Sequence, residues 1–177
     1  MLYAAFTKHF PHKKMASLLR GLGREWRYGY LCRRLHTSTI MIDQIEFTLR
    51  ERPQGCHLVT GEIEAALPPL PRTGLLHLLL KHTSAAICLN ENYDPDVRTD
   101  LNQILHRLVP EGEPYYRHTL EGLDDMPAHA IQALIGAQIT IPITNGKLNL
   151  GTWQGIYLCE LRRHGGRRSV VATVIGG

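Results

Sequence analysis

The sequence predicts a β-rich α+β domain over residues 41–177, a jelly-roll-like β-sandwich with two main helices. Short runs of alternating or wholly apolar residues recur between turn signals, as the strands of such a domain do. Only two segments combine capping residues with the periodicity of a longer helix. Many short strands with few helices favour two packed sheets.

The first half of the domain is predicted to contain four strands and one helical turn. Residues 42–49 alternate imperfectly between apolar and polar side chains, which favours an edge strand. Residues 56–59 are expected to form a short strand, and residues 62–67 a helical turn that ends at a proline-rich break. Residues 75–80 and 85–89 are strongly apolar, which is typical of central strands covered on both faces.

The two longer helices carry start and stop signals. An Asp-Pro-Asp run at residues 94–96 supplies a cap, a proline at the first helical position and an acid in the first turn. Pro110 follows the expected end of this helix. The second helix is predicted over residues 127–135 and should stop at Gly136.

The last part of the chain is predicted to be β-structure. Asn145-Gly146 is a strong hairpin signal, because both residues of such a turn need a positive φ. Gly165-Gly166 predicts a second hairpin. Strands are expected over residues 138–143, 147–150, 155–161 and 170–175.

Charge divides the chain near residue 40. Residues 1–40 hold eight of the 20 Lys and Arg residues and one of the 16 Asp and Glu residues, so residues 41–177 have a net charge of −3. This balance argues against the basic face that nucleic-acid binding requires. No run approaches the roughly 18 apolar residues of a membrane span. We therefore expect neither nucleic acid nor a membrane as a partner.

Residues 1–40 form a basic N-terminal extension that we exclude from the predicted fold. We favour an upstream start over-call, with Met41 as the true start, and keep an organelle transit peptide or a basic arm as alternatives. The expected compartment is the cytoplasm, or an organelle if the extension is a transit peptide. Cys56, Cys88 and Cys159 lie in apolar runs without a C-x-x-C pair, which favours buried reduced thiols over a disulfide or a thiolate metal site.

The densest polar cluster is HTLEGLDDMPAH at residues 118–129. Its imidazoles and carboxylates are ligands of divalent cations, with Zn²⁺ or Mg²⁺ as the candidate cofactor. Simple capping of the following helix is the alternative for both aspartates. We predict His118, Asp124 and His129 as metal ligands, and Glu121 and Asp125 as catalytic groups.

Two further clusters are candidates for the same site. His82 follows an apolar strand and is predicted as a metal ligand or a base, with a satisfied core histidine as the alternative. Glycines surround Trp153 and Gln154, where a ring can stack on a ligand and backbone can approach it closely; a turn with a buried Trp is equally compatible. The predicted substrate-binding residues are Lys81, Thr83, Ser84, Asn90, Glu91, Arg117, Trp153 and Gln154.

Four long stretches carry a family resemblance: GLLHLLLKHTSAAICLNENYDPDVRTD, HTLEGLDDMPAH, IPITNGKLNLGTWQGIYLCELR and RRSVVATVIGG. From about Met41 to its C-terminus, the chain resembles the YjbQ family, also labelled secondary thiamine-phosphate synthase enzymes. The resemblance implies a compact domain that assembles as a homotrimer. It also implies a polar site at His82, His118, Glu121, Asp125 and His129, with Trp153 and Gln154 nearby.

Three functions remain open. The resemblance implies a thiamine-phosphate synthase-type transferase that joins a hydroxymethylpyrimidine diphosphate to a thiazole phosphate and releases pyrophosphate; acids at 121, 124 and 125 would hold Mg²⁺ and Lys81 or Arg117 would face phosphate. The residues alone favour a Zn-dependent hydrolase or lyase acting on a small metabolite, because imidazole is a poor Mg²⁺ ligand. The third function is a non-catalytic trimeric module that binds a metal or a metabolite.

Overall fold

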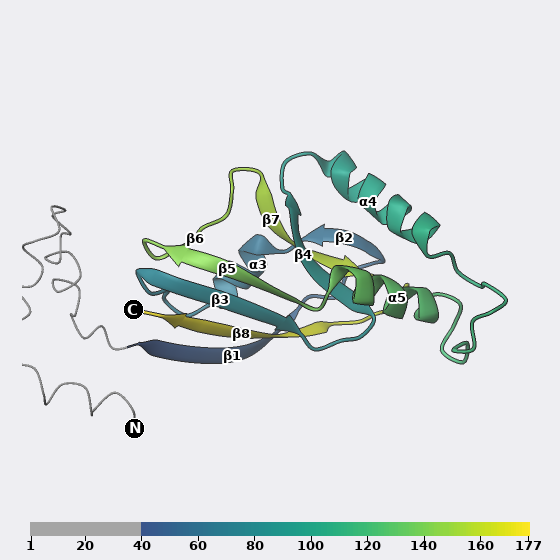
Figure 1. Ribbon diagram of the computed structural model, residues 1–177, viewed down its shortest axis with the longest axis horizontal. Coiled ribbons are helices and arrows are strands. Elements are labelled where there is room, and N and C mark those ends of the chain that lie inside the picture. The colour runs from purple at the N-terminus through teal and green to yellow at the C-terminus, as the bar shows by residue number, and fades with distance from the viewer. Residues whose placement is uncertain (1–39) are drawn as a thin grey trace, which may run out of the picture. The chain divides into compact units, whose positions relative to one another are not determined.

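The computed structural model describes residues 40–177, so residues 1–39 of the basic extension, with Cys32, lie outside the described residues. The described chain forms two antiparallel sheets and three helices (Figure 1). The larger sheet has the order β1 (Met41–Leu49), β8 (Arg168–Gly176), β3 (Thr73–Leu80), β5 (Gln138–Thr144) and β6 (Lys147–Leu148). The smaller sheet has the order β2 (Gly55–Leu58), β7 (Gln154–Glu160) and β4 (Ala85–Glu91). The helices are α3 (Thr60–Ala66), α4 (Pro95–Leu108) and α5 (Asp125–Ile135).

Two hydrophobic clusters hold these layers together. The main core lies between the sheets and includes Leu76 and Leu78 of β3 with Ile87 and Leu158 of the smaller sheet. The second cluster covers the other side of the smaller sheet, where Ala128 and Ile131 of α5 pack with residues of β2, β4 and β7. The predicted β-rich α+β sandwich with two main helices is therefore confirmed.

The strand at residues 41–49 pairs only with β8 and is an edge strand, as predicted. Two expectations for the apolar strands were wrong. β3 is central, but only one of its faces is buried. On its other face, Leu75 and Leu79 are 46% and 40% exposed. β4 is an edge of the smaller sheet, where β7 takes the central place. β4 is nevertheless covered on both faces, because Ala85 and Ile87 lie in the main core whereas Ala86 and Cys88 face the second cluster.

Of the two predicted hairpin turns, one is confirmed and one is wrong. Asn145 and Gly146 have φ values of 53° and 75° and join β5 to β6, which confirms the hairpin. The predicted hairpin at Gly165-Gly166 is wrong, because β7 and β8 belong to different sheets and do not pair. These glycines instead carry the chain from one sheet to the other, with Gly166 at a φ of 72°.

The two longer helices predicted from their capping residues are confirmed. Asp94 caps α4 by accepting a hydrogen bond from the Asp96 N–H, and the helix ends two residues before Pro110. α5 begins at Asp125, two residues before the predicted start, and ends at Ile135, followed by Gly136 with a φ of 109°. Over residues 40–177, no helix is both long enough and apolar enough to cross a membrane.

Candidate metal centre

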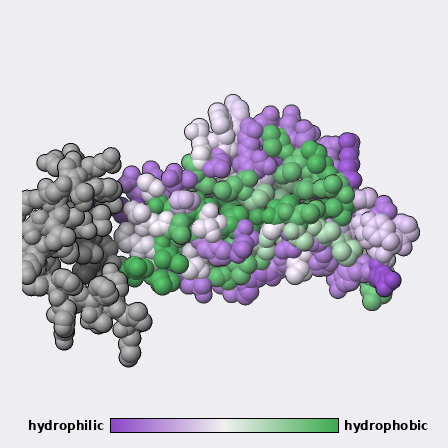
Figure 2. Space-filling model, viewed as in Figure 1, coloured by the Kyte–Doolittle hydropathy of each residue, from purple (hydrophilic) through white to green (hydrophobic). Residues whose placement is uncertain are grey.

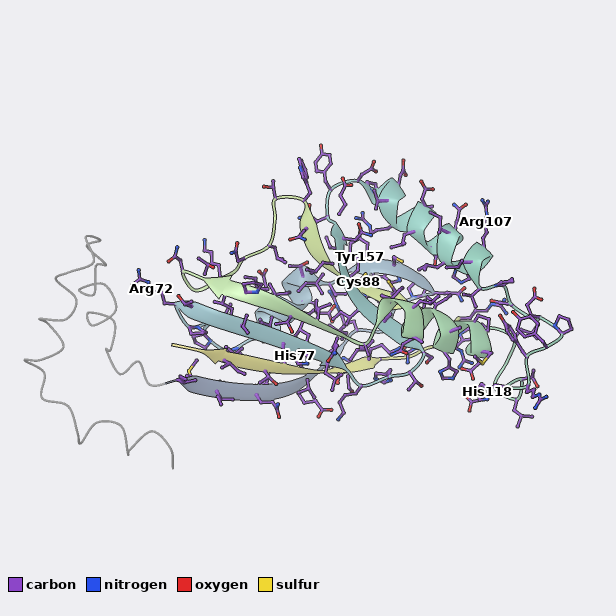
Figure 3. All side chains as sticks on the ribbon, viewed as in Figure 1. Arg72, His77, Cys88, Arg107, His118 and Tyr157 are labelled. Atoms are coloured by element: carbon purple, nitrogen blue, oxygen red, sulfur yellow. The ribbon has the colours of Figure 1, made fainter. Side chains whose placement is uncertain are left out.

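Three side chains from the densest polar cluster meet at one end of the domain. Asp125 and His129 are four residues apart and therefore share one face of α5. His118 approaches them from the loop between α4 and α5 (Figure 3). Their three donor atoms lie within 4.8 Å of one another, and this is the only such group of three or more His, Cys, Asp or Glu residues found over residues 40–177.

The carboxylate of Asp125 lies between the two imidazoles. Its Oδ2 atom is 2.6 Å from Nε2 of His118 and 3.4 Å from Nε2 of His129. The Asp125 side chain is 1% exposed, and the close polar neighbours of Oδ2 are these two ring nitrogens, neither of which forms a well-aligned hydrogen bond with it. A buried carboxylate is costly unless a positive charge compensates it, either a protonated imidazole or a metal ion. A bound cation between these three atoms would supply that compensation.

A backbone carbonyl orients the imidazole ring of His129. Its Nδ1 atom lies 2.9 Å from the backbone carbonyl of Thr83, so this nitrogen carries the proton and donates the hydrogen bond. In that tautomer Nε2 presents its lone pair to the cluster. Histidines that bind metals in proteins are usually held in the same way by a second hydrogen bond. Thr83 therefore contributes its main chain to the centre, whereas its side chain had been predicted to bind substrate.

Arg162 contacts the centre and was not among the residues predicted for it from the sequence. Its guanidinium group contacts Oδ1 of Asp125, donates a hydrogen bond of 3.0 Å to Asp124 and donates one of 2.7 Å to the Glu121 carbonyl. This fork fixes one oxygen of Asp125 and leaves the other directed at the histidines. The available signal was a charged residue two positions after a buried strand, since β7 ends at Glu160.

Asp124 was predicted as a metal ligand, but its carboxylate faces the arginines. Oδ2 accepts hydrogen bonds of 3.0 Å from the Arg162 side chain and from the Arg163 N–H. Burial opposes ionisation of this carboxyl, but these hydrogen bonds outweigh the burial and lower its pKa from the ordinary value. Asp124 precedes α5 without forming a side-chain cap. It anchors the loop rather than joining the three donor atoms.

His82, predicted both as a ligand and as a base, lies outside the group of three. Its Nε2 atom accepts a hydrogen bond of 2.8 Å from the Ser169 N–H, so that lone pair is occupied. Its Nδ1 atom lies 3.4 Å from the Arg168 guanidinium group. Burial lowers the pKa of His82, and the nearby Arg168 lowers it further. The ring is therefore neutral at pH 7 and ties β8 to the loop after β3.

Of the other residues predicted in the first two clusters, some lie beside the three donor atoms and others lie next to the strands of the larger sheet. Glu121 is exposed beside the centre, with its carboxylate 3.9 Å from Arg162. Arg117 is exposed and precedes His118, with no ion-pair partner among residues 40–177. Lys81 pairs with Glu46 of β1 at 2.7 Å, away from the three donor atoms. Ser84 is half-buried on the loop between β3 and β4.

The third cluster occupies a different end of the domain (Figure 1). Trp153 lies on the loop before β7 and packs edge-to-face against Tyr93, with the ring centroids 5.1 Å apart. The Gln154 side chain accepts a hydrogen bond of 2.8 Å from the Gly151 N–H and shapes its own loop. Asn90 and Glu91 lie on β4, paired with the start of β7. Within one chain these four predicted residues do not join the centre.

A small open hollow adjoins His118. It is formed by the loop between α4 and α5 and is lined by Gly112, Glu113, Tyr116, His118, Thr119, Gly122 and Leu123. Two imidazoles and one carboxylate leave open coordination positions on a divalent transition metal, as catalytic sites require. The hollow lies where a small ligand would reach such a position.

Comparisons with known families and relatives agree with this architecture. Residues 44–177 match the family model described as UPF0047 protein YjbQ-like. The UPF0047 protein YjbQ of Salmonella typhimurium is 50% identical over 135 residues, which cover 75% of this chain and 97% of that protein. A UPF0047 protein of Methanocaldococcus jannaschii is 40% identical over 89 residues, which cover 50% of this chain and 62% of that protein.

Solved structures show the same fold. A conserved hypothetical protein from Thermus thermophilus superposes with a TM-score of 0.64 at 33% identity, covering 72% of this chain and 97% of that one. A YbjQ-like protein of unknown function from Sulfolobus solfataricus superposes with a TM-score of 0.67 at 21% identity, covering 78% of this chain and 99% of that one. The second similarity supports the fold alone.

Proposed function

Because the chain belongs to the YjbQ-like UPF0047 family, a family of conserved proteins of unknown function, we propose its activity from the chemistry of its own site. We propose that the domain is a metal-dependent enzyme, a hydrolase or lyase acting on a small metabolite, with Zn²⁺ held by His118, Asp125 and His129. The observation that carries this proposal is the convergence of the buried Oδ2 atom of Asp125 with the Nε2 atoms of His118 and His129, all within 4.8 Å of one another.

The donor set favours Zn²⁺ over Mg²⁺. Two of the three donors are imidazole nitrogens, which suit Zn²⁺ and are poor Mg²⁺ ligands. The bound ion would supply Lewis-acid polarisation of an oxygen atom on the substrate or on a water molecule. Arg162 holds Asp125 in place, and the carbonyl of Thr83 holds His129. The exposed carboxylate of Glu121 is the group we assign to accept a proton from the attacking water.

A thiamine-phosphate synthase-type transferase is the second candidate. Arg117 supports it, because this exposed cation adjoins His118 and has no ion-pair partner among residues 40–177. A phosphate or diphosphate group of a substrate would neutralise it. Release of pyrophosphate that requires both phosphorylated substrates, and that weakens in an Arg117→Ala variant, would favour this reaction over hydrolysis.

The metal content of the purified chain tests the proposal. After exhaustive dialysis, we expect close to one Zn²⁺ per chain in the wild type, measured by elemental analysis, and almost none in His118→Ala. His164→Ala is the matched control, because His164 is exposed on the loop between β7 and β8 and should leave the metal content unchanged. Absence of retained metal from all three proteins would contradict a tight site.

We also propose that the chain assembles as a homotrimer through the outer face of the larger sheet. Ile42, Ile175 and Leu75 are neighbours across β1, β8 and β3 and form one exposed apolar row. Figure 2 shows hydrophobic surface at the start of β1, and a second area over α5 and the adjoining part of α4. Contiguous exposed apolar residues of this kind are a feature of protein–protein interfaces.

Light scattering after size-exclusion chromatography measures this assembly. We expect the mass of a trimer for the wild type and the mass of a monomer for Leu75→Glu, because the charge would be buried in the interface. Leu120→Glu is the control, since Leu120 is 99% exposed on the loop between α4 and α5. An unchanged mass for Leu75→Glu would show that this row is not the interface.

A further inference from the structure

Three thiols lie together on the helix-covered side of the smaller sheet. Cys56 comes from β2, Cys159 from the central strand β7 and Cys88 from β4. Cys159 is fully buried, Cys56 is 8% exposed and Cys88 is half-buried. Cys56 and Cys159 belong to the cluster that includes Ala128 and Ile131 of α5, and Cys88, labelled in Figure 3, packs against it.

The geometry distinguishes one pair from the other. Cys56 and Cys159 are direct partners in the register of β2 and β7, and their sulfur atoms are 3.6 Å apart. Opposed residues of antiparallel strands have Cα atoms about 4.5–5.5 Å apart, which lies inside the range that a disulfide accepts. The register partner of Cys88 is Tyr157, so Cys88 is diagonal to Cys159. Diagonal neighbours lie roughly 7–8 Å apart, which is too far for a relaxed disulfide.

We propose that Cys56 and Cys159 are an oxidation site that forms a disulfide between β2 and β7 when the protein meets a peroxide. The Cys56 sulfur attacks one peroxide oxygen, the O–O bond breaks, and a first water leaves as Cys56 becomes a sulfenic acid. The Cys159 sulfur then attacks the Cys56 sulfur and loses its proton. The S–O bond breaks, a second water leaves, and the S–S bond forms. The peroxide is reduced as the two thiols are oxidised.

The environment assigns the two roles. The hydrogen bond shared with Cys159 lowers the pKa of Cys56, against the opposing effect of burial, and an interaction with Cys159 lowers the pKa of Cys88 in the same way. Hydrogen bonds to Cys56 and Cys88, together with burial, raise the pKa of Cys159. Thiolates rather than thiols attack peroxides. Cys56 is 8% exposed and Cys159 is 0% exposed, so the peroxide reaches Cys56 first; Cys56 is therefore the attacking thiol and Cys159 the resolving one, in agreement with these pKa shifts.

The disulfide would stabilise the folded domain. It would join residues 103 positions apart in the chain and would therefore restrict the unfolded chain strongly. It would also lie in the hydrophobic cluster to which Ala128 and Ile131 of α5, the helix that carries Asp125 and His129, belong. We expect the thermal midpoint of the oxidised protein to exceed that of the reduced protein, and dithiothreitol to reverse the rise.

Peptide mapping of the native full chain tests the proposal. The reduced protein is treated with hydrogen peroxide, its free thiols are alkylated, and its peptides are analysed by mass spectrometry without reduction. We expect a Cys56–Cys159 linked peptide, lighter by two hydrogen atoms than its parts, in the wild type and in Cys88→Ser. The link should be absent from Cys56→Ser, which should also show no rise in thermal midpoint.

Two results would overturn the proposal. One is full alkylation of both Cys56 and Cys159 after peroxide treatment of the folded protein. The other is a link that joins Cys88 to Cys159 instead, which the register disfavours. The Cys88→Ser variant separates these cases, because it retains the proposed pair and removes the competing thiol.

Discussion

Replacing Asp125 with asparagine is expected to weaken Zn²⁺ binding by at least about 100-fold, more than the roughly 10- to 100-fold typical of a residue that only supports a ligand. The variant keeps the shape of the side chain but removes the negative charge between the two imidazoles. Arg162 keeps its contacts with Asp124 and Glu121, so the loop should remain folded. Competition with a chromogenic chelator measures the affinity.

Two companion variants test the role given to each group. Arg162→Lys should weaken binding by about 10-fold, because an ammonium group cannot replace the planar fork that holds Asp125, Asp124 and the Glu121 carbonyl together. Asp100→Asn removes an exposed carboxylate from α4 and should change nothing. Equal affinities for Asp125→Asn and Asp100→Asn would remove Asp125 from the ligand set.

Glu160→Gln is expected to lower the free energy of unfolding by about 3–5 kcal/mol, the usual cost of breaking a buried ion pair. Glu160 and Arg168 are 0% and 5% exposed and form two hydrogen bonds of 2.6 and 2.7 Å. Removing the carboxylate charge leaves the guanidinium group buried and uncompensated. Gly165 packs against both side chains, where a Cβ atom would overlap them. Denaturant titration measures the loss.

The surface pair of Arg163 and Glu111 is the control for this measurement. Because the Arg163 side chain is largely exposed, Glu111→Gln should cost less than about 1 kcal/mol. The double variant Glu160→Leu with Arg168→Met should recover much of the lost stability, since it removes both buried charges. A loss in Glu160→Gln as small as that in Glu111→Gln would show that the buried pair is not a major source of stability.

Local signals in the sequence predicted the features that local physics determines. The Asp-Pro-Asp start of α4, the glycine that ends α5 and the Asn145-Gly146 turn are each decided by a few adjacent residues. His118, Asp125 and His129 also belong to one short segment of the sequence, in which all three were predicted as site residues. Two of these residues share a helix face, and the third is only seven residues away from Asp125.

Features that depend on distant segments were not predictable in the same way. Arg162 reaches Asp125 because β7 ends beside the start of α5, and no periodicity in the sequence indicates that meeting. His82 follows β3 as expected, yet β8 supplies the N–H group that occupies its Nε2 atom. The apolar run of β4 indicated burial correctly but did not distinguish cover by a helix from a central place in a sheet.

The candidate centre combines two donor residues on a packed helix with a third donor residue on a loop. Asp125 and His129 belong to a helix seated on the hydrophobic layer, whereas His118 is carried by a connecting segment that contributes little to that layer. Changes in the length or composition of this segment would alter what fits beside the centre at small cost to folding. The sequence of this segment can therefore change the shape of the space beside His118 while the two sheets and α5 keep the same arrangement.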